Sequence, residues 1–476
     1  MDDLRPILIS KIIDYAAEDR PNYSKPRLSP YATISKKWQQ VVEANSFSCI
    51  RITNDEITTF ATCFENEPRR RMLRQIFLRI YSTSETRKCW SEVAISERAE
   101  ESRRNDETLT TSTRALFQSL EGWRAEERVD LYIIIHAHGD HGMSPLRTEP
   151  KFLEPETLAR VECVKKFVFR NHAITPTQTV IGLASRLPGL QHIDWLIFSE
   201  RTGGRSDDVV RVQNRVDLAA QLIMLQKHNP LLKKLELSFT ASKTPPGHDD
   251  VVPSILLPFD QRDYLSQSLR NLSQGMQEVS LENMIISSQL FWPMEDETTE
   301  LHWPTLERYK IGINPMAAEG GWWLDGLTRF RARERVRNNT PRNDEGKTKL
   351  VVIYDREVEE AERYPIWPTE ELDDLLLVMV KAVAKMPVLK SFSAFVDLDH
   401  WVEDQRFGVW YLQTGERIGS VEALFDDEDD DNDAENNLGK KRLYWSGPKE
   451  WCMSGELSQA WNKILGEDGV VRYHEW

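Results

Sequence analysis

Three histidines and an aspartate lie close together just after an apolar segment of the chain. They are His136, His138, Asp140 and His141, within the sequence VDLYIIIHAHGDHG. Imidazole nitrogens and a carboxylate at this spacing, placed just past a strand, could hold two zinc ions and activate a bridging hydroxide. The chemistry suggested by these four residues is metal-assisted hydrolysis.

This arrangement resembles the zinc motif of metallo-β-lactamase-like hydrolases. That resemblance implies a further Gly-His ligand, then an aspartate and a last histidine. The only plausible Gly-His ligand is His248, 107 residues beyond His141, and neither His302 nor His400 has a motif around it. We therefore favour a polar loop after a strand. Adventitious metal binding and a zinc hydrolase are the alternatives, and we expect no catalytic residue, metal or cofactor.

A repeated apolar pattern, φ-x-x-φ-x-φ, where φ is apolar or aromatic, predicts the strands and helices that would position such residues. Several copies follow a helical spacing of apolar residues and a proline that ends the helix, as at Pro188, Pro230 and Pro387. The copies, with a first one near the N-terminus, are Leu73/Ile76/Leu78, Val164/Phe167/Phe169, Leu190/Ile193/Trp195, Leu232/Leu235/Leu237, Met276/Val279/Leu281, Leu306/Tyr309/Ile311 and Leu389/Phe392/Ala394. Such spacing predicts short strands that alternate with helices.

A strand and a helix that repeat in this way cannot bury their apolar face alone and must stack on neighbouring units. The fold class that we predict is α/β, an irregular leucine-rich-repeat-type solenoid over residues 51–476, with insertions at about 315–349 and 425–440. A further strand is expected at Leu350–Tyr354. The chain should close with a helix and a strand. The helices expected before strands are Thr177–Leu187, Val209–Lys227, Asp260–Leu272 and Glu370–Lys385; the closing residues are Leu457, Trp461, Ile464 and Leu465, then Val470, Val471 and Tyr473.

Residues 1–50 form a separate helical module in this interpretation. A first helix carries Leu8, Ile12 and Ile13 on one side, and a second carries an apolar stripe that includes Ile34 and Trp38. A module of this length cannot support a core alone. It is therefore expected to pack on the solenoid, on another protein, or on both.

The module resembles the F-box, and its second helix, LSPYATISKKWQQVVE, is similar to F-box proteins of filamentous fungi that also carry irregular leucine-rich repeats. The resemblance implies a non-enzymatic substrate receptor in the ubiquitin conjugation pathway. The module would bind the Skp-type adaptor of a cullin–RING (SCF-type) ubiquitin ligase, by apolar residues that fill a groove, and the solenoid would bind an unknown protein target. The implied adaptor-binding residues are Leu4, Pro6, Leu8, Ile12, Ile13 and Trp38.

Two residues depart from the F-box pattern, because Arg5 stands where the family usually has proline and Ile7 where it has glutamate. As an alternative, the N-terminal module does not bind an adaptor and only caps the first repeat. The protein would then be a protein-binding scaffold that acts independently of a ligase.

Composition narrows the classes of partner and compartment. The net charge is −15, and eight of the carboxylates lie within Asp426–Glu435. A mildly acidic chain does not favour nucleic-acid binding. Five widely spaced cysteines without a C-x-x-C motif favour a reducing compartment. The polar N-terminus and short apolar runs favour neither secretion nor a membrane, so we expect the cytosol, the nucleus or both.

Other residues are weaker candidates for binding. The arginines of RFRARERVR would face one way on an extended strand and could hold an anionic partner, although a solvated face is the simpler interpretation. Tryptophans could anchor a partner or, more simply, fill the core. We find no phosphate-binding loop and no nucleophile elbow. The residues in question are Arg329, Arg331, Arg333, Arg335 and Arg337, and Trp322, Trp323, Trp401, Trp410, Trp445 and Trp451.

Overall fold

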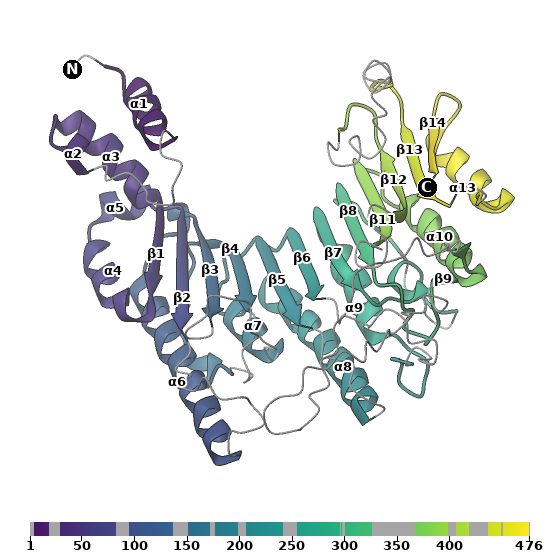
Figure 1. The fold of residues 1–476 in the computed structure, drawn as a ribbon, viewed down its shortest axis with the longest axis horizontal. Coiled ribbons are helices and arrows are strands. Elements are labelled where there is room, and N and C mark those ends of the chain that lie inside the picture. The colour runs from purple at the N-terminus through teal and green to yellow at the C-terminus, as the bar shows by residue number, and fades with distance from the viewer. Residues whose placement is uncertain are drawn as a thin grey trace, which may run out of the picture. The chain divides into compact units, whose positions relative to one another are not determined.

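The computed structural model of the chain is mixed α/β, with eleven α-helices and fourteen strands among the residues it describes (Figure 1). These residues are 4–18, 29–81, 95–136, 151–171, 177–198, 206–240, 255–295, 297, 300–325, 367–397, 406–417, 437–448 and 451–475. Twelve of the strands pair side by side with their neighbours in β-sheet structure. Their order is β1 to β7 in one part of the chain and β8-β11-β12-β13-β14 in the other.

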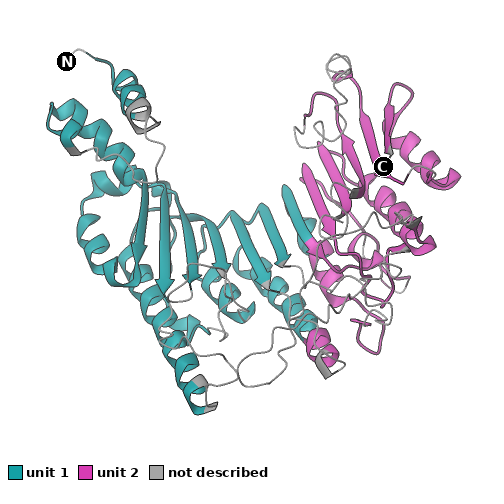
Figure 2. Cartoon of the chain, in the orientation of Figure 1, with its two compact units in different colours: residues 1–200, 214–240, 271–282 teal, residues 201–213, 241–270, 283–476 magenta. Residues whose placement is uncertain are grey.

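The chain divides into two compact units (Figure 2). The first contains Met1–Glu200, Asn214–Thr240 and Asn271–Glu282, and the second contains Arg201–Gln213, Ala241–Arg270 and Asn283–Trp476. The division expected between residues 50 and 51 stays a prediction.

The first unit is built on parallel strands that pair in chain order. Parallel neighbours need a crossover between them, and the helices supply several of these. The strands are β1 (Cys49–Thr53), β2 (Gln75–Tyr81), β3 (Val129–His136), β4 (Val164–Asn171), β5 (His192–Phe198), β6 (Lys234–Thr240) and β7 (Glu278–Met284), the last belonging to this unit as far as Glu282. The helices are α4 (Ile57–Cys63), α5 (Glu67–Met72), α6 (Ile95–Leu120), α7 (Thr177–Ala184) and α8 (Ser206–His228), the last from Asn214 on.

The repeated apolar pattern marks the core. Every residue of its seven copies is buried, and the copies run into β2, β4, β5, β6, β7, β8 and β11. Side chains alternate along each strand, as in β3, where Leu131, Ile133 and Ile135 are buried and the residues between them are half-buried. In six of the copies the first apolar residue lies just before the strand and extends the buried row into the preceding turn; in the remaining copy it is Val164, the first residue of β4.

The turn before β6 shows how one unit is tied to the previous one. Asn229 is buried, and its amide donates hydrogen bonds to the carbonyls of Ala184 and Leu187, at 3.0 and 2.9 Å. These carbonyls belong to the C-terminal end of α7 and its following turn, where intrahelical donors run out. The side chain of Asn229 therefore satisfies the end of the preceding helix.

The second unit combines parallel and antiparallel pairs. β8 (Arg308–Ile313) is parallel to β11 (Ser391–Asp397), β12 (Arg406–Leu412) is antiparallel to both β11 and β13 (Arg442–Gly447), and β14 (Val470–Glu475) is parallel to β13. Fewer than a dozen residues separate β11 from β12, too few for the crossover that a parallel neighbour requires. The remaining elements are α9 (Tyr264–Ser273), of which Tyr264–Arg270 belong here, α10 (Glu370–Val383), α13 (Gly455–Leu465), β9 (Leu324–Asp325) and β10 (Trp367–Pro368).

The expected helices at Thr177–Leu187, Val209–Lys227, Asp260–Leu272 and Glu370–Lys385 correspond to α7, α8, α9 and α10. The expected closing elements are α13 and β14, with Leu457, Trp461 and Leu465 buried. The strand expected at Leu350–Tyr354 lies outside the described residues, as does most of the two expected insertions.

Candidate functional site

The N-terminal helices have a small core of their own. α1 (Pro6–Glu18) and the short α2 (Ser29–Ala32) both contact α3 (Lys36–Ser48), and the buried cluster consists of Ile9, Ile13, Trp38 and Val42. Ser35 caps α3, because its hydroxyl accepts a hydrogen bond from the backbone N–H of Trp38 at 3.5 Å. This cluster determines which side of α1 packs against α3 and which side faces away from it.

The six residues implied as adaptor-binding fall into two groups. Ile13 and Trp38 are 2% and 3% exposed and belong to the cluster, and Leu4 packs against it. Leu8 and Ile12 are 44% and 42% exposed, and Pro6, the first residue of α1, is also exposed. The expectation that Ile13 shares one side of the helix with Leu8 and Ile12 is therefore wrong.

Helix geometry explains the separation, because residues four apart lie above one another. Ile9 and Ile13 make the buried row, and Leu8 and Ile12 make the next row around the helix, which is exposed. Ile7 is exposed as well, at 65%. Ile7, Leu8 and Ile12 together are called the α1 apolar surface below; large apolar residues concentrated on one short helix suggest an interaction site.

A second candidate is the outward sheet face of the first unit, formed by the side chains of β1 to β7 that alternate with the buried ones. The register places them in rows, because directly paired residues of parallel strands point to the same side. Most are half-exposed, and Val168 and Asp194 are buried. The rows are Cys49, Gln75, Asp130, Lys166, His192, Lys234 and Glu278; Arg51, Phe77, Tyr132, Val168, Asp194, Glu236 and Ser280; and Arg79, Ile134 and Arg170.

Aromatic rings stack on the β1–β3 part of this face. The rings of Phe77 and Tyr132 lie 4.2 Å apart, with an angle of 13° between their planes, and the guanidinium of Arg51 lies 5.7 Å from the centre of the Phe77 ring. Tyr81 stacks on His136 at 5.5 Å. Stacked rings beside a cation form a preorganised surface for an apolar or aromatic group.

Two ion pairs and a histidine–glutamate hydrogen bond join neighbouring strands on the β4–β7 part. Arg170 lies 2.7 Å from Asp194, His192 lies 2.8 Å from Glu236, and Lys234 lies 2.7 Å from Glu278. Burial raises the pKa of Asp194 despite its arginine partner, and the neighbouring Glu236 raises it further. Hydrogen bonding with His192 lowers the pKa of Glu236. The pKa values of these two carboxylates therefore shift in opposite directions, because burial dominates at Asp194 and hydrogen bonding dominates at Glu236.

Replacing Glu236 with glutamine is expected to destabilise the sheet at pH 6 by up to about 1 kcal/mol, because the pair is partly exposed. The pKa of Glu236 lies below its ordinary 4.5, so its stabilisation is present above that pH and is lost as the pH falls through the lowered pKa. The deficit of Glu236→Gln should therefore shrink toward pH 3. Hydrogen exchange of β5 and β6 at several pH values measures it.

Asp194→Asn is the matched variant, with the opposite trend. The pKa of Asp194 is raised, so the contribution of its titration is present at low pH and lost as the pH rises. A deficit of Glu236→Gln that is equal at pH 6 and pH 3 would contradict the assigned pairing.

Of the four residues in the histidine motif, the structure describes His136. His136 ends β3 on the outward sheet face, half-buried against Tyr81, and His138, Asp140, His141, His248 and His400 lie outside the described residues. Within the part of the chain that the structure describes, no group of three or more histidine, cysteine, aspartate or glutamate side chains could hold a metal ion. The zinc site, an alternative interpretation of the four motif residues, stays a prediction.

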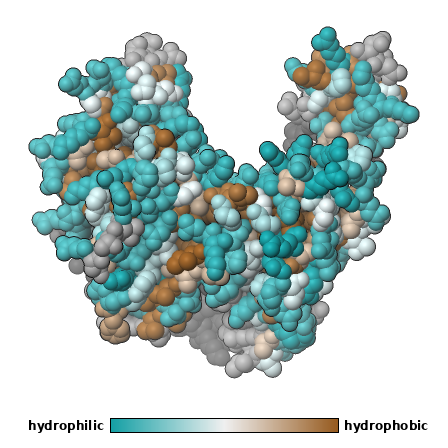
Figure 3. Space-filling model, turned by 180° about the vertical axis from the view of Figure 1, so that it is seen from behind, coloured by the Kyte–Doolittle hydropathy of each residue, from teal (hydrophilic) through white to brown (hydrophobic). Residues whose placement is uncertain are grey.

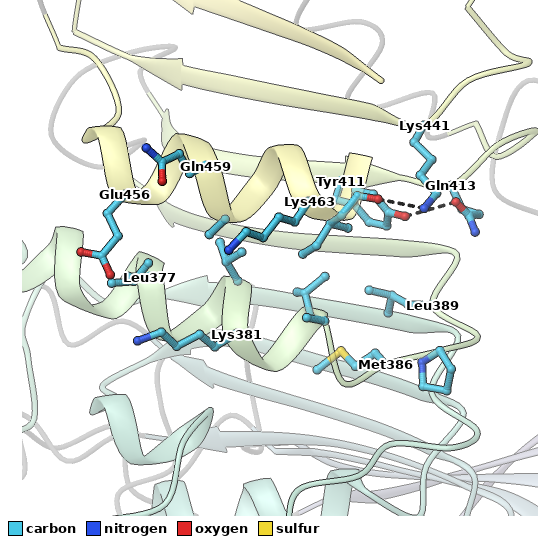
Figure 4. Close-up of a pocket in the computed structure, with 16 residues that line it drawn as sticks. Leu377, Lys381, Met386, Leu389, Tyr411, Gln413, Lys441, Glu456, Gln459 and Lys463 are labelled. Atoms are coloured by element: carbon cyan, nitrogen blue, oxygen red, sulfur yellow. Dashed lines mark hydrogen bonds between the residues drawn. The ribbon is translucent and has the colours of Figure 1, made fainter. Parts of the chain in front are cut away.

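A groove in the second unit is a third candidate. It has a volume of about 660 Å³ and lies between α10 and α13, with Leu389 and Tyr411 beneath (Figure 4). Lys441, at one end, donates a hydrogen bond to the carbonyl of Ile464 at 2.8 Å, and Tyr411 donates one to Gln413 at 3.1 Å. Both polar groups thus have hydrogen-bond partners within the unit. We therefore interpret the groove as a space between two packed helices and not as a ligand site.

The other candidate residues divide between the core and undescribed segments. Trp323, Trp410 and Trp445 are buried, and Trp322 and Trp451 are half-buried. Trp401, the arginines from Arg329 to Arg337 and the acidic run Asp426–Glu435 lie outside the described residues. Figure 3 shows hydrophilic side chains over most of the face that it presents, with smaller apolar areas between them.

The chain matches no protein-family model and no curated protein. None of the described helices combines the length and the apolar character needed to cross a membrane.

Proposed function

We propose that the protein is a non-enzymatic substrate receptor of a cullin–RING ubiquitin ligase, acting in the cytosol or nucleus. Its N-terminal module, an F-box-like one, docks the Skp-type adaptor, and the following α/β part, a leucine-rich-repeat-type solenoid, holds a protein target. The exposed Pro6, Leu8 and Ile12 supply the contact with the adaptor, and the half-buried Leu4 adds to it. Ile13 and Trp38 act from beneath, as positioning residues.

The observation that carries this proposal is the α1 apolar surface. Ile7, Leu8 and Ile12 are exposed on a helix whose other side is already filled by Ile9 and Ile13. A helix that only capped the first repeat would be expected to turn its large apolar residues inward. An amphipathic helix with a second apolar face instead suits insertion into an apolar groove of a partner.

The α/β part supports the receptor role through its regularity. Parallel strands in chain order, each with a buried apolar row and an outward row, give an extended surface of the kind on which solenoid proteins bind their partners. On that surface the stacked rings near β2 and β3 and the ion pairs near β5 and β6 offer different chemistry. The target would be chosen there, while the ligase is engaged at α1.

A pull-down of the full-length chain with a purified Skp-type adaptor tests the proposal. Wild type is expected to retain the adaptor, and Leu8→Asp/Ile12→Asp to lose about a hundredfold or more in affinity, because an unpaired carboxylate in an apolar groove costs several kcal/mol. Ile223→Asp is the matched control, since Ile223 is also exposed on a helix, α8, at 58%.

A folded wild-type chain that does not bind the adaptor would contradict the ligase role. A protein-binding scaffold would then be the remaining proposal, since it needs the outward sheet face and not α1. The zinc hydrolase would require stoichiometric zinc in the chain after chelation and dialysis, lost on His136→Ala.

A further inference from the structure

Charge is unevenly distributed over the outward sheet face. On β1 to β4 the outward cations are Arg51, Arg79, Lys166 and Arg170, and the outward carboxylate is Asp130. On β5 to β7 carboxylates outnumber cations instead. The outward carboxylates there are Asp194, Glu236, Glu278 and Glu282, and the outward cation is Lys234. The β1–β4 part is thus cationic and the β5–β7 part anionic.

The cations nearest the aromatic rings are available to a ligand. Among the described residues, neither Arg51 nor Arg79 forms an ion pair, and Arg51 is exposed beside the Phe77 ring. Asp130 is the outward carboxylate on β3, and it is paired in register with Lys166. Burial raises the pKa of Asp130, and the positive charge of Lys166 acts in the opposite direction. A guanidinium without a carboxylate partner is well suited to bind an anionic group through two hydrogen bonds.

We infer that the outward face around Arg51, Phe77, Arg79, Tyr132 and Ile134 binds an acidic peptide segment that carries an aromatic side chain. The carboxylates bind the two guanidiniums, and the aromatic side chain packs on the stacked rings of Phe77 and Tyr132. This inference rests on the proposed function, for which it names the class of target.

The spacing fits an extended peptide. Arg51 is paired with Phe77, and Arg79 lies two residues further along the neighbouring strand. One strand spacing of about 4.8 Å and two residues of about 3.3 Å place the two arginines roughly 8 Å apart along the face. Alternate side chains of an extended peptide are roughly 7 Å apart, so carboxylates at positions one and three match the two arginines. Phe77 lies in the row of Arg51, and Tyr132 lies in the same row one strand further on, so both rings lie on one side of the line between the arginines. An aromatic residue at position two, whose side chain projects to the opposite side of the peptide from the two carboxylates, faces these rings.

Fluorescence anisotropy with the full-length chain tests this inference. The probe is a labelled peptide containing Glu-Phe-Glu, and the comparison peptides have glutamine for both glutamates or alanine for phenylalanine. We expect both replacements to weaken binding. We also expect Arg51→Glu/Arg79→Glu to weaken it by tenfold or more, because each charge-assisted hydrogen bond contributes substantially. Affinity should fall with added salt.

Two variants serve as controls. Glu282→Gln alters an exposed charge on the anionic part of the same face and should leave the affinity within about twofold. Arg51→Lys/Arg79→Lys should restore part of the affinity that charge reversal removes, since the charge is kept without the planar fork.

The inference is overturned if the folded wild type does not bind the probe, or if charge reversal leaves its affinity unchanged. It is also overturned if a single-stranded DNA oligonucleotide of equal charge binds more tightly than the peptide. Failure here and failure of the proposed function are distinguishable. Leu8→Asp/Ile12→Asp should keep the peptide and lose the adaptor, and Arg51→Glu/Arg79→Glu should do the reverse.

Discussion

Trp38→Ala is expected to release α1 from α3 and to abolish adaptor binding, although Trp38 is only 3% exposed. The indole packs with Ile9, Ile13 and Val42 and stacks on Tyr31 at 6.2 Å. Removal of a buried tryptophan side chain costs about 3–5 kcal/mol. Since this small cluster is all that joins α1 to α3 within the described core, the loss should exceed its local stability. Hydrogen exchange of α1 and α3, with the adaptor pull-down, measures both effects.

Trp38→Phe and Gln40→Ala are the controls for this prediction. The indole N–H of Trp38 is buried and has no hydrogen-bond partner among the described residues, so phenylalanine should keep most of the packing and most of the binding. Gln40 is exposed on the same helix. If Trp38→Ala keeps the exchange protection of α1 and still loses the adaptor, then Trp38 contacts the adaptor directly and its role as a positioning residue is wrong.

Glu297→Gln is expected to destabilise the second unit by about 3–5 kcal/mol, because it leaves a buried charge without its partner. Arg270 is 1% exposed; its guanidinium is paired with Glu297 and donates a hydrogen bond to the carbonyl of Gln289 at 2.9 Å. A neutral glutamine does not replace the charge of the carboxylate, so the cost of burying the guanidinium is less well offset. Urea denaturation, followed by hydrogen exchange of α9, measures the loss.

A double variant separates the value of the pair from the penalty of breaking it. Arg270→Met/Glu297→Gln removes both charges and should recover much of the stability lost in Glu297→Gln, since an apolar side chain can replace a buried ion pair at little cost. Glu300→Gln, at an exposed position nearby, should change the stability by less than about 0.5 kcal/mol. A double variant no more stable than Glu297→Gln would contradict this account.

The α1 helix shows where prediction from sequence ends for the candidate site. An apolar helix was predicted there, and so were the implied contact residues. The assignment of Ile13 to the same side as Leu8 was wrong, and Ile9 was missed, although its position four residues before Ile13 is a usable signal. Helical spacing defines several apolar rows, and only the packing of α1 against α3 selects the buried one.

The outward sheet face shows a similar limit. The buried copies of the apolar pattern could be read from local spacing, because alternation along a strand is a local property. Arg51, Phe77 and Tyr132 come from β1, β2 and β3, and no spacing in the chain relates them. Their meeting depends on strand register, which long-range packing determines.

By itself the sequence determined which residues are buried along β2, β4 to β8 and β11, where α7 to α10 and α13 lie, and that helices and strands alternate. Each of these follows from periodicity or a helix-ending proline, which act over a few residues. Only the tertiary structure decided which row of α1 stays exposed, that β12 turns back antiparallel, and which side chains of β1 to β3 share one surface. Those outcomes depend on contacts between segments far apart in the chain, whose energies no local pattern contains.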